Sequence, residues 1–153
     1  MKDKESSRVN SRKPIIYDES VDIRFSDLDS YGHVNSKHYV DFVSTARLVY
    51  MAKHVKTTID DAAKNGIGFY LTKSTINYLR PITGLVRVRC RSHVQDIRDG
   101  KVLVIPFELL TEDGKRKYSD GTLEFTIVDM NTKRMTTAPG WVADLFFEPS
   151  GQT

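Results

Sequence analysis

The sequence predicts an α+β domain in which an antiparallel sheet is wrapped around one long central helix. Two observations support this class: one long apolar helical segment near the N-terminal end, and a series of strand-like segments joined by tight turns through the rest of the chain. Strands that follow one another through short turns pair antiparallel. The single long helix is then the element that such a sheet has to cover.

The long helix is expected over residues 36–53, with Asn35 or Ser36 as its N-cap. Apolar residues at helical spacing define its first face, namely Tyr39, Phe42, Val43, Ala46 and Tyr50. Further apolar residues cover much of the other side, namely Val40, Leu48, Val49 and Met51. A helix that is apolar on nearly all faces is predicted to be buried.

The remaining elements follow from local patterns. A first strand is expected over 20–25, and a short second helix over 57–65, capped by Thr57 or Thr58 and closed by Gly66. Alternating or β-branched segments predict strands over 68–79, 86–95, 102–110 and 118–129, and 141–147 is a candidate short terminal helix. Pro106 indicates an edge strand or a bulge. A sheet of this kind has free edges that invite pairing with a second copy of the chain.

Composition limits the class of protein. The 153 residues predict one domain over 15–149, after a polar tail over 1–14 that we expect to be disordered and that lacks the apolar core of a signal peptide. The chain has no apolar run long enough to span a membrane, so we expect a cytoplasmic protein. A net charge of +3, spread along the chain, argues against a nucleic-acid partner. Cys90 is the only cysteine, and the four histidines show no zinc-binding spacing, so no metal site is expected.

The segment most typical of a functional site runs over residues 24–35 and leads directly into the helix. It contains two aspartates, Asp27 and Asp29, then a glycine, a histidine and the helix start. The N–H groups of a helix N-terminus can hold a carbonyl oxygen that gains negative charge. A carboxylate beside them can serve as a base or a nucleophile. The residues therefore outline an acyl-transfer site, although a loop aspartate that only caps backbone N–H groups has the same pattern.

Three motifs in order resemble a known family: Arg24-Phe25-x-Asp27-x-Asp29-x-x-Gly32-His33-Val34-Asn35-x-x-x-Tyr39, then Tyr78-x-x-Pro81, then Val128-Asp129-x-x-Thr132-x-Arg134. Together they resemble the hot-dog-fold thioesterases of the 4-hydroxybenzoyl-CoA thioesterase type, over roughly 21–139. The resemblance implies a homodimer joined sheet edge to sheet edge, in some members a homotetramer, with active sites at the dimer interface. It implies acyl thioesters of coenzyme A or acyl carrier protein as substrates, and neither a metal nor a bound cofactor.

Carried over by position, the resemblance makes Asp29 the catalytic residue, acting either as nucleophile or as general base. It gives the polarisation of the carbonyl to backbone N–H groups around Asn35 and Ser36. Gly32, His33 and Val34 complete the loop, and we expect Asp27 to hold that loop by hydrogen bonds. The substrate-binding candidates are Tyr39, which we expect to pack in the core or line the acyl pocket, together with Thr75, Asn77 and Arg80.

Two positions depart from the family pattern. Ser36 stands where aryl-specific and short-acyl-specific members often carry Tyr or His, so the acyl specificity is open. Leu85 follows Gly84 at a position where Asp is common in the family, and we expect this difference to affect only a turn. The alternative function is a non-catalytic acyl-CoA-binding module of the same fold. A hot-dog dehydratase is disfavoured because the helix offers Asp41 without a catalytic histidine beside it.

Overall fold

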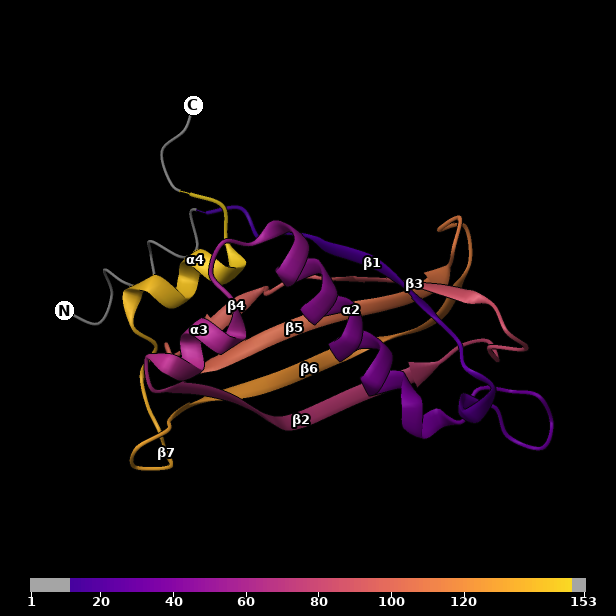
Figure 1. Cartoon of the computed structure of the whole chain (residues 1–153), viewed down its shortest axis with the longest axis horizontal. Helices are drawn as coiled ribbons and strands as arrows, with labels where there is room; N and C mark the ends of the chain where they lie inside the picture. The colour runs from indigo at the N-terminus through magenta and orange to yellow at the C-terminus, as the bar shows by residue number, and fades with distance from the viewer. Residues whose placement is uncertain (1–11, 150–153) are drawn as a thin grey trace.

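The computed structural model describes residues 12–149 as one antiparallel sheet crossed by a long helix (Figure 1). The seven-stranded sheet has the order β1-β3-β5-β6-β2, with β4 beside β5 and β7 beside β6. The strands are β1 (Tyr17–Asp22), β2 (Ile67–Tyr78), β3 (Arg87–Ser92), β4 (Asp96–Arg98), β5 (Val102–Thr111), β6 (Lys117–Asp129) and β7 (Arg134–Met135). Every strand pair is antiparallel, as predicted.

The long helix α2 (Tyr39–His54) follows the 3₁₀ turn η2 (Ser36–His38), and Asn35 caps that turn by accepting the Lys37 N–H at 3.2 Å. The predicted helix is confirmed, but its burial on nearly all faces is wrong. Leu48 and Val49 are 55% and 37% exposed, respectively. The sheet covers one side of α2 only, so the apolar residues on the opposite side are not covered by any other part of residues 12–149 (Figure 1).

The shorter helices lie near the two chain ends. Helix α3 (Ile59–Lys64) begins at a capping box in which Thr58 Oγ1 accepts the Asp61 N–H and Asp61 Oδ2 accepts the Thr58 N–H. Helix α4 (Ala143–Phe146) follows the turn η3 (Gly140–Val142). These two elements match the predicted short helices. No helix within residues 12–149 is long and apolar enough to cross a bilayer.

The first described residues pack against the last ones. Arg12 pairs with Asp144 at 2.9 Å, the Ile15 N–H donates to Phe146 O at 2.9 Å, and the Glu148 N–H donates to Lys13 O at 2.8 Å. The expected disorder of the tail over 1–14 is therefore wrong for residues 12–14. The rest of that predicted tail lies outside the described residues. Residues 12–15 therefore lie beside the segment that contains α4.

Of the two positions predicted for Pro106, the edge strand is wrong because β5 is an interior strand, and an irregularity of the ladder is what the structure has there. Strand β5 pairs with β6 on one side and with β3 and then β4 on the other. Pro106 stands opposite the break between the last β3 pair, Ser92 with Phe107, and the first β4 pair, Asp96 with Val104. A residue without an N–H is tolerated there because the ladder is already interrupted.

The two faces of the sheet differ in chemistry. Cys90 and Val88 point into the core from β3, while their neighbours Arg87 and Arg89 point outward and pair with Asp22 and Asp18 on β1. The alternation predicted for this segment is confirmed. The arginines on β3 therefore belong to a solvated, ion-paired strand face.

Candidate active site

The Asp29 side chain closes its own loop. Its Oδ1 atom accepts the backbone N–H groups of Tyr31 at 2.8 Å and His33 at 3.1 Å. The backbone adds two bonds, Asp29 N–H to His33 O at 2.7 Å and Gly32 N–H to Asp29 O at 3.0 Å. Gly32 has φ +73°, a conformation that glycine adopts at little cost. Asp29 is exposed, and its Oδ2 atom accepts no hydrogen bond from the described chain. One carboxylate oxygen is thus fixed, while the other is free of hydrogen bonds within the described chain.

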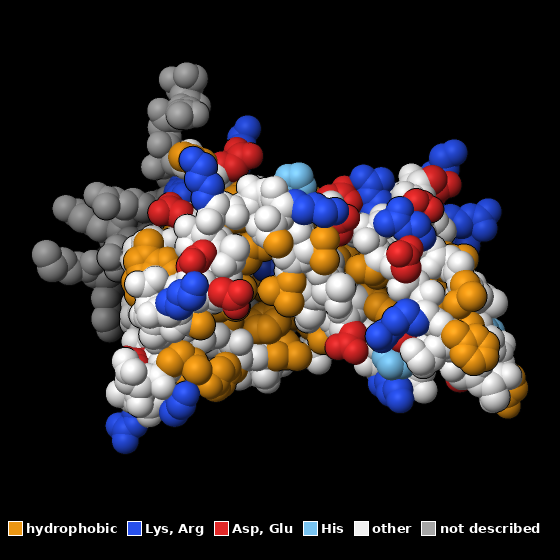
Figure 2. Space-filling model, in the orientation of Figure 1, with side chains coloured by type: hydrophobic (Ala, Val, Ile, Leu, Met, Phe, Trp, Pro, Cys, Tyr) orange, Lys and Arg blue, Asp and Glu red, His pale blue; other side chains and the backbone are white. Residues whose placement is uncertain are grey.

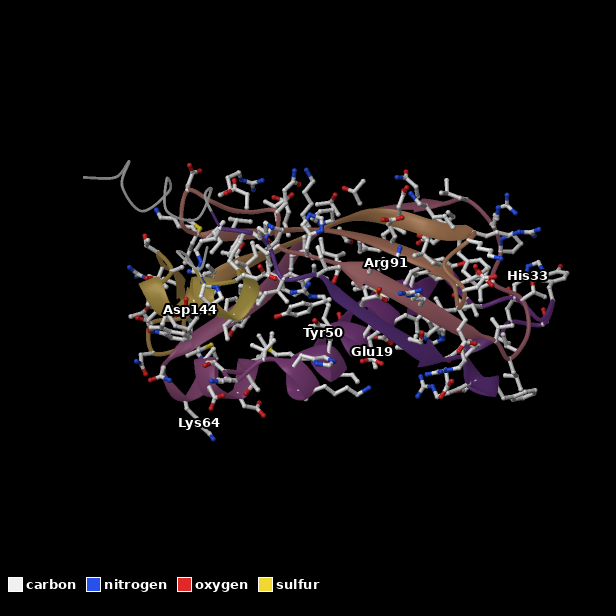
Figure 3. The ribbon with its side chains drawn as sticks, turned by 90° about the horizontal axis from the view of Figure 1, so that it is seen from above. Glu19, His33, Tyr50, Lys64, Arg91 and Asp144 are labelled. Carbon is white, nitrogen blue, oxygen red and sulfur yellow. The ribbon has the colours of Figure 1, made fainter. Side chains whose placement is uncertain are left out.

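The loop is tied to the segment that follows β2. The Val34 N–H donates to Ile82 O at 2.8 Å, and the Gly84 N–H donates to Gly32 O at 3.1 Å. Val34 and Ile82 are both buried, so this junction is anchored in the core. Figure 3 shows His33 at one end of the molecule, far from the labelled Tyr50 and Asp144. The Asp29 loop therefore projects beyond the strand ends while its base stays fixed.

The helix start offers one backbone donor. The Asn35 N–H donates to Asp27 O at 2.9 Å, the Lys37 N–H to Asn35 Oδ1 at 3.2 Å, and the His38 N–H to Asn35 O at 3.0 Å. Among the N–H groups of residues 32–38, only that of Ser36 has no acceptor within residues 12–149. Asn35 is therefore a cap whose own N–H is occupied, and Ser36 is the residue whose N–H can reach a ligand.

Asp27 holds the loop, as expected, and is fully buried. Its carboxylate accepts the Arg24 backbone N–H at 2.8 Å and the Arg24 Nη2 at 3.0 Å. His38 Nδ1 lies 3.8 Å from Asp27 Oδ1. Burial by itself raises the pKa of Asp27, but the hydrogen bonds from Arg24 outweigh it and hold the pKa below its ordinary value. An ionised carboxylate so enclosed has no open oxygen to offer a substrate.

The structure adds His38 to the surroundings of this loop. Sequence pattern gives little reason to expect it, because a histidine at a helix start is most simply a solvated residue. The contact with Asp27 depends on the loop folding back onto the helix start. The second nearby carboxylate, Asp41, lies 3.9 Å from the same Nδ1 and could have been anticipated from its i,i+3 spacing.

The predicted substrate-binding residues separate into different environments. Tyr39 is 4% exposed and packs edge-on against Tyr78, with ring centroids 5.0 Å apart. Burial raises its pKa, so its phenol stays protonated at neutral pH. Asn77 donates to Asp120 Oδ1 at 2.9 Å on the neighbouring strand. Thr75 and Arg80 are exposed. Within the described chain, no hydrogen bond joins Thr75, Asn77 or Arg80 to the Asp29 loop.

An antiparallel sheet crossed by one long helix defines the hot-dog class of proteins, and the exposed Asp29 loop at the helix start is the candidate site on that fold. The family model described as thioesterase-like superfamily matches residues 23–146. The chain belongs to that family, and it is a thioester hydrolase.

A curated relative and two solved structures agree with this assignment. The long-chain acyl-CoA thioesterase FadM of Escherichia coli K12 is 23% identical over 120 residues, covering 78% of this chain and 89% of the relative. A DHNA-CoA thioesterase from Staphylococcus aureus superposes with a TM-score of 0.71 at 21% identity, over 80% of each chain. A second Staphylococcus aureus protein, solved in complex with CoA, gives a TM-score of 0.73 at 14% identity, over 87% of this chain and 83% of that one. These structural similarities establish the fold.

Proposed function

We propose that this protein hydrolyses acyl thioesters of coenzyme A, or of acyl carrier protein, to a free acid and a thiol, with Asp29 as the catalytic residue. The observation that supports the proposal is the state of the exposed Asp29 carboxylate: Oδ1 is fixed by two backbone N–H groups, whereas Oδ2 has no hydrogen-bond partner within the described chain. An exposed carboxylate that is fixed by hydrogen bonds at a helix start can either attack a carbonyl carbon or activate a water molecule.

The polarising group in this proposal is the Ser36 N–H. It lies at the start of η2, and an oxygen that gains negative charge is stabilised by such a donor and by the partial positive charge of the helix N-terminus. The leaving thiolate is already stable, so a strong general acid is not required. The proposal thus uses no metal and no bound cofactor, and it leaves the nucleophilic and general-base routes both open.

Substrate class is inferred from the relatives. The curated relative is named a long-chain acyl-CoA thioesterase, one structural relative is named a DHNA-CoA thioesterase, and another was solved with CoA. Two of these names specify coenzyme A thioesters as substrates, and the third specifies CoA itself as a ligand. The length and shape of the acyl group do not follow from them, because the named acyl groups differ.

We further propose that the working unit is a homodimer, with a homotetramer as the larger form. Strand β2 ends the sheet (Figure 1). Residues 70–75 along it are all exposed. A free edge strand of this length supports pairing with a second copy. In such a dimer Thr75, Asn77 and Arg80 would serve the partner's Asp29 loop, which accounts for their separation from the loop within one chain.

The alternative expected from the sequence is a non-catalytic acyl-CoA-binding module, and the match to a thioesterase family argues against it. The two hydrogen bonds to Asp29 Oδ1 give this aspartate a loop-forming role that needs no catalysis. The two candidates differ in turnover. A binding module binds acyl-CoA without releasing free thiol, whereas a thioesterase releases one thiol for each thioester consumed.

The test compares Asp29→Asn, Asp29→Ala and the control Asp60→Asn on a panel of acyl-CoA substrates, with free thiol as the readout. Asparagine keeps an oxygen that can accept the Tyr31 and His33 N–H groups, so Asp29→Asn should fold normally and lose about 10²- to 10⁴-fold in kcat. Asp29→Ala should also loosen the loop. The exposed Asp60 on α3 controls for removal of a surface charge, and Asp60→Asn should match the parent.

Full activity of a folded Asp29→Asn protein would refute the assignment of Asp29. Binding of acyl-CoA by the parent without thiol release from any substrate in the panel would instead favour the binding module. Circular dichroism of each variant establishes that a loss of activity is not a loss of fold.

A further inference from the structure

A cavity of about 160 Å³ lies between α2, α3 and the sheet, toward the C-terminal end of α2. Its walls are mostly apolar and include Met51, Leu103, Ile105, Phe125 and Phe146. Figure 2 shows a hollow surrounded by hydrophobic side chains on the face that carries α2, with a basic side chain visible inside it. Arg47 is the basic residue among those that line the cavity.

The Arg47 guanidinium is buried and makes few polar contacts. The residue is 9% exposed, its Nη1 donates to Ser92 Oγ at 3.0 Å, and its guanidinium carbon lies 4.7 Å from the Tyr17 ring centroid. A guanidinium has five N–H donors. Within the described chain, the guanidinium of Arg47 makes one hydrogen bond, to Ser92. The nitrogens that make no hydrogen bond are nevertheless not fully buried. The remaining donor nitrogens therefore keep some accessible surface, and Arg47 is among the residues that line the cavity.

The charge of Arg47 is not neutralised by a carboxylate. Within residues 12–149 no Asp or Glu lies within ion-pair distance of it, and none lines the cavity. The titratable groups that interact with Arg47 are Tyr17, Cys90 and His93. Burial raises the pKa of Tyr17 and of Cys90 to about 12, and burial followed by the charge of Arg47 lowers the pKa of His93, so none of the three supplies a negative charge at pH 7. Burial also lowers the pKa of Arg47, but a guanidinium stays protonated in proteins. A full positive charge thus faces an apolar cavity, an arrangement that is unfavourable until an anion pairs with it.

We propose that this cavity is a binding site for an apolar carboxylic acid, whose carboxylate pairs with Arg47 and whose hydrocarbon body fills the apolar walls. A carboxylate matches the fork of guanidinium donors. An amine would be repelled by Arg47, and inorganic phosphate would leave the apolar walls without a partner. A cavity of similar size lined by Leu, Ile and Phe is known to hold a benzene-sized molecule, so the space suits a short chain or a single ring.

The site is separate from the Asp29 loop along the helix. Arg47 follows Tyr39 by eight residues, which corresponds to about 12 Å along an α-helix. The carboxylate therefore belongs either to a free acid or to the far end of an acyl group whose thioester lies at the loop. Both sources present the same chemistry to Arg47, and binding of a free acid does not depend on the protein being a thioesterase.

The test measures binding of octanoate and of the neutral octanamide by calorimetry, to the parent, to Arg47→Met and to the control Arg91→Met. Arg91 lies on the outer face of the sheet and pairs with Asp18, so its variant removes an equal charge elsewhere. Octanoate is expected to bind the parent and Arg91→Met at least about tenfold more tightly than octanamide, and Arg47→Met should lose this preference. Equal binding of the two probes by the parent, binding of neither, or a preference retained in Arg47→Met would overturn the proposal.

If Arg47→Met does not fold, Ser44→Leu serves as the second variant, because it narrows the cavity and leaves Arg47 in place. Ser44→Leu should weaken the binding of octanoate at least about tenfold, and an unchanged affinity for octanoate would overturn the proposal.

The source of the carboxylate is distinguished by hydrolysis of acyl-CoA substrates whose acyl group ends in a methyl group or in a carboxylate. A selectivity for the carboxylate end that disappears in Arg47→Met assigns the site to the acyl group. An unchanged selectivity, with octanoate binding lost, assigns it to a free acid.

Discussion

Asn35 donates its backbone N–H to the backbone oxygen of Asp27 at 2.9 Å, and this bond fixes the loop to the start of the helix. Asp29 lies inside the segment that the bond closes. The bond also removes the Asn35 N–H from the donors available to a ligand, which leaves the Ser36 N–H as the one at the helix start. The buried carboxylate of Asp27 stabilises the same junction through Arg24 and lies beside His38.

Asp27→Asn should destabilise the protein in a pH-dependent way. Asp27 has a folded pKa held below the ordinary 3.8, so its carboxylate contributes stability above pH 3.8 and that contribution is lost as the pH falls through the folded pKa. We expect the variant to lose about 1–3 kcal/mol of unfolding free energy at neutral pH. Urea denaturation at a series of pH values measures the unfolding free energies of the parent and the variant, and the difference between them should shrink in acid. A difference in unfolding free energy that stays constant as the pH falls to the folded pKa would contradict the ion pair of Asp27 with Arg24.

Gly32→Ala should weaken the Asp29 loop through the backbone alone. Gly32 has φ +73°, and a Cβ atom there would meet no atom within 4 Å, so no steric clash contributes. The cost is the left-handed conformation itself, about 1 kcal/mol for alanine. Asparagine adopts this conformation more readily, so Gly32→Asn should retain more thioesterase activity than Gly32→Ala. Equal losses in the two variants would point to a cause other than backbone conformation.

Gly121→Ala should disturb the pairing of β2 with β6. A Cβ atom at Gly121 would collide with the backbone oxygen of Thr75 and lie 3.0 Å from the Phe107 ring. Backbone cannot move aside as a flexible side chain can, so we expect a loss of about 1–3 kcal/mol. The control is Gly140→Ala, where a Cβ atom meets nothing within 4 Å. Thermal denaturation should show a lower midpoint for Gly121→Ala and no decrease for Gly140→Ala.

Cys90 should be unreactive in the native protein. It is buried in the core, and burial raises the pKa of its thiol to about 12, so almost no thiolate forms at assay pH. Ellman's reagent is expected to label Cys90 only in denaturant, and the labelling rate then reports unfolding. Free thiol released from acyl-CoA can therefore be measured without background from the folded protein. Rapid labelling without denaturant would contradict the burial of this residue.

Local patterns predicted the parts of the fold that depend on neighbouring residues. The capped helix start at Asn35, the Thr58 capping box and the alternation along β3 all arise from residues a few positions apart. The exposure of Leu48 and the interior place of Pro106 depend on which strands lie beside them. Neither could be predicted from periodicity alone.

The candidate site was predictable to a similar degree. The ordered motif singled out Asp29, whose catalytic role stays a prediction, and the family resemblance favoured a loop role for Asp27. The occupied Asn35 N–H and the contact of the loop with Ile82 require pairings between distant segments. Arg47 carried no signal, because an arginine on a helix most often lies in solvent. Its burial depends on Tyr17 and Phe146, which lie 30 residues before it and 99 residues after it in the sequence.

The contacts between residues 12–15 and 144–148 make the chain suitable for circular permutation. Because Lys13 and Glu148 are hydrogen-bonded, a short linker could join Pro149 to Arg12 without rerouting either segment. New ends could then be opened at Asp113-Gly114, an exposed turn between β5 and β6. Such a circular permutant would keep every strand pairing of the parent while reversing which half of the chain leaves the ribosome first.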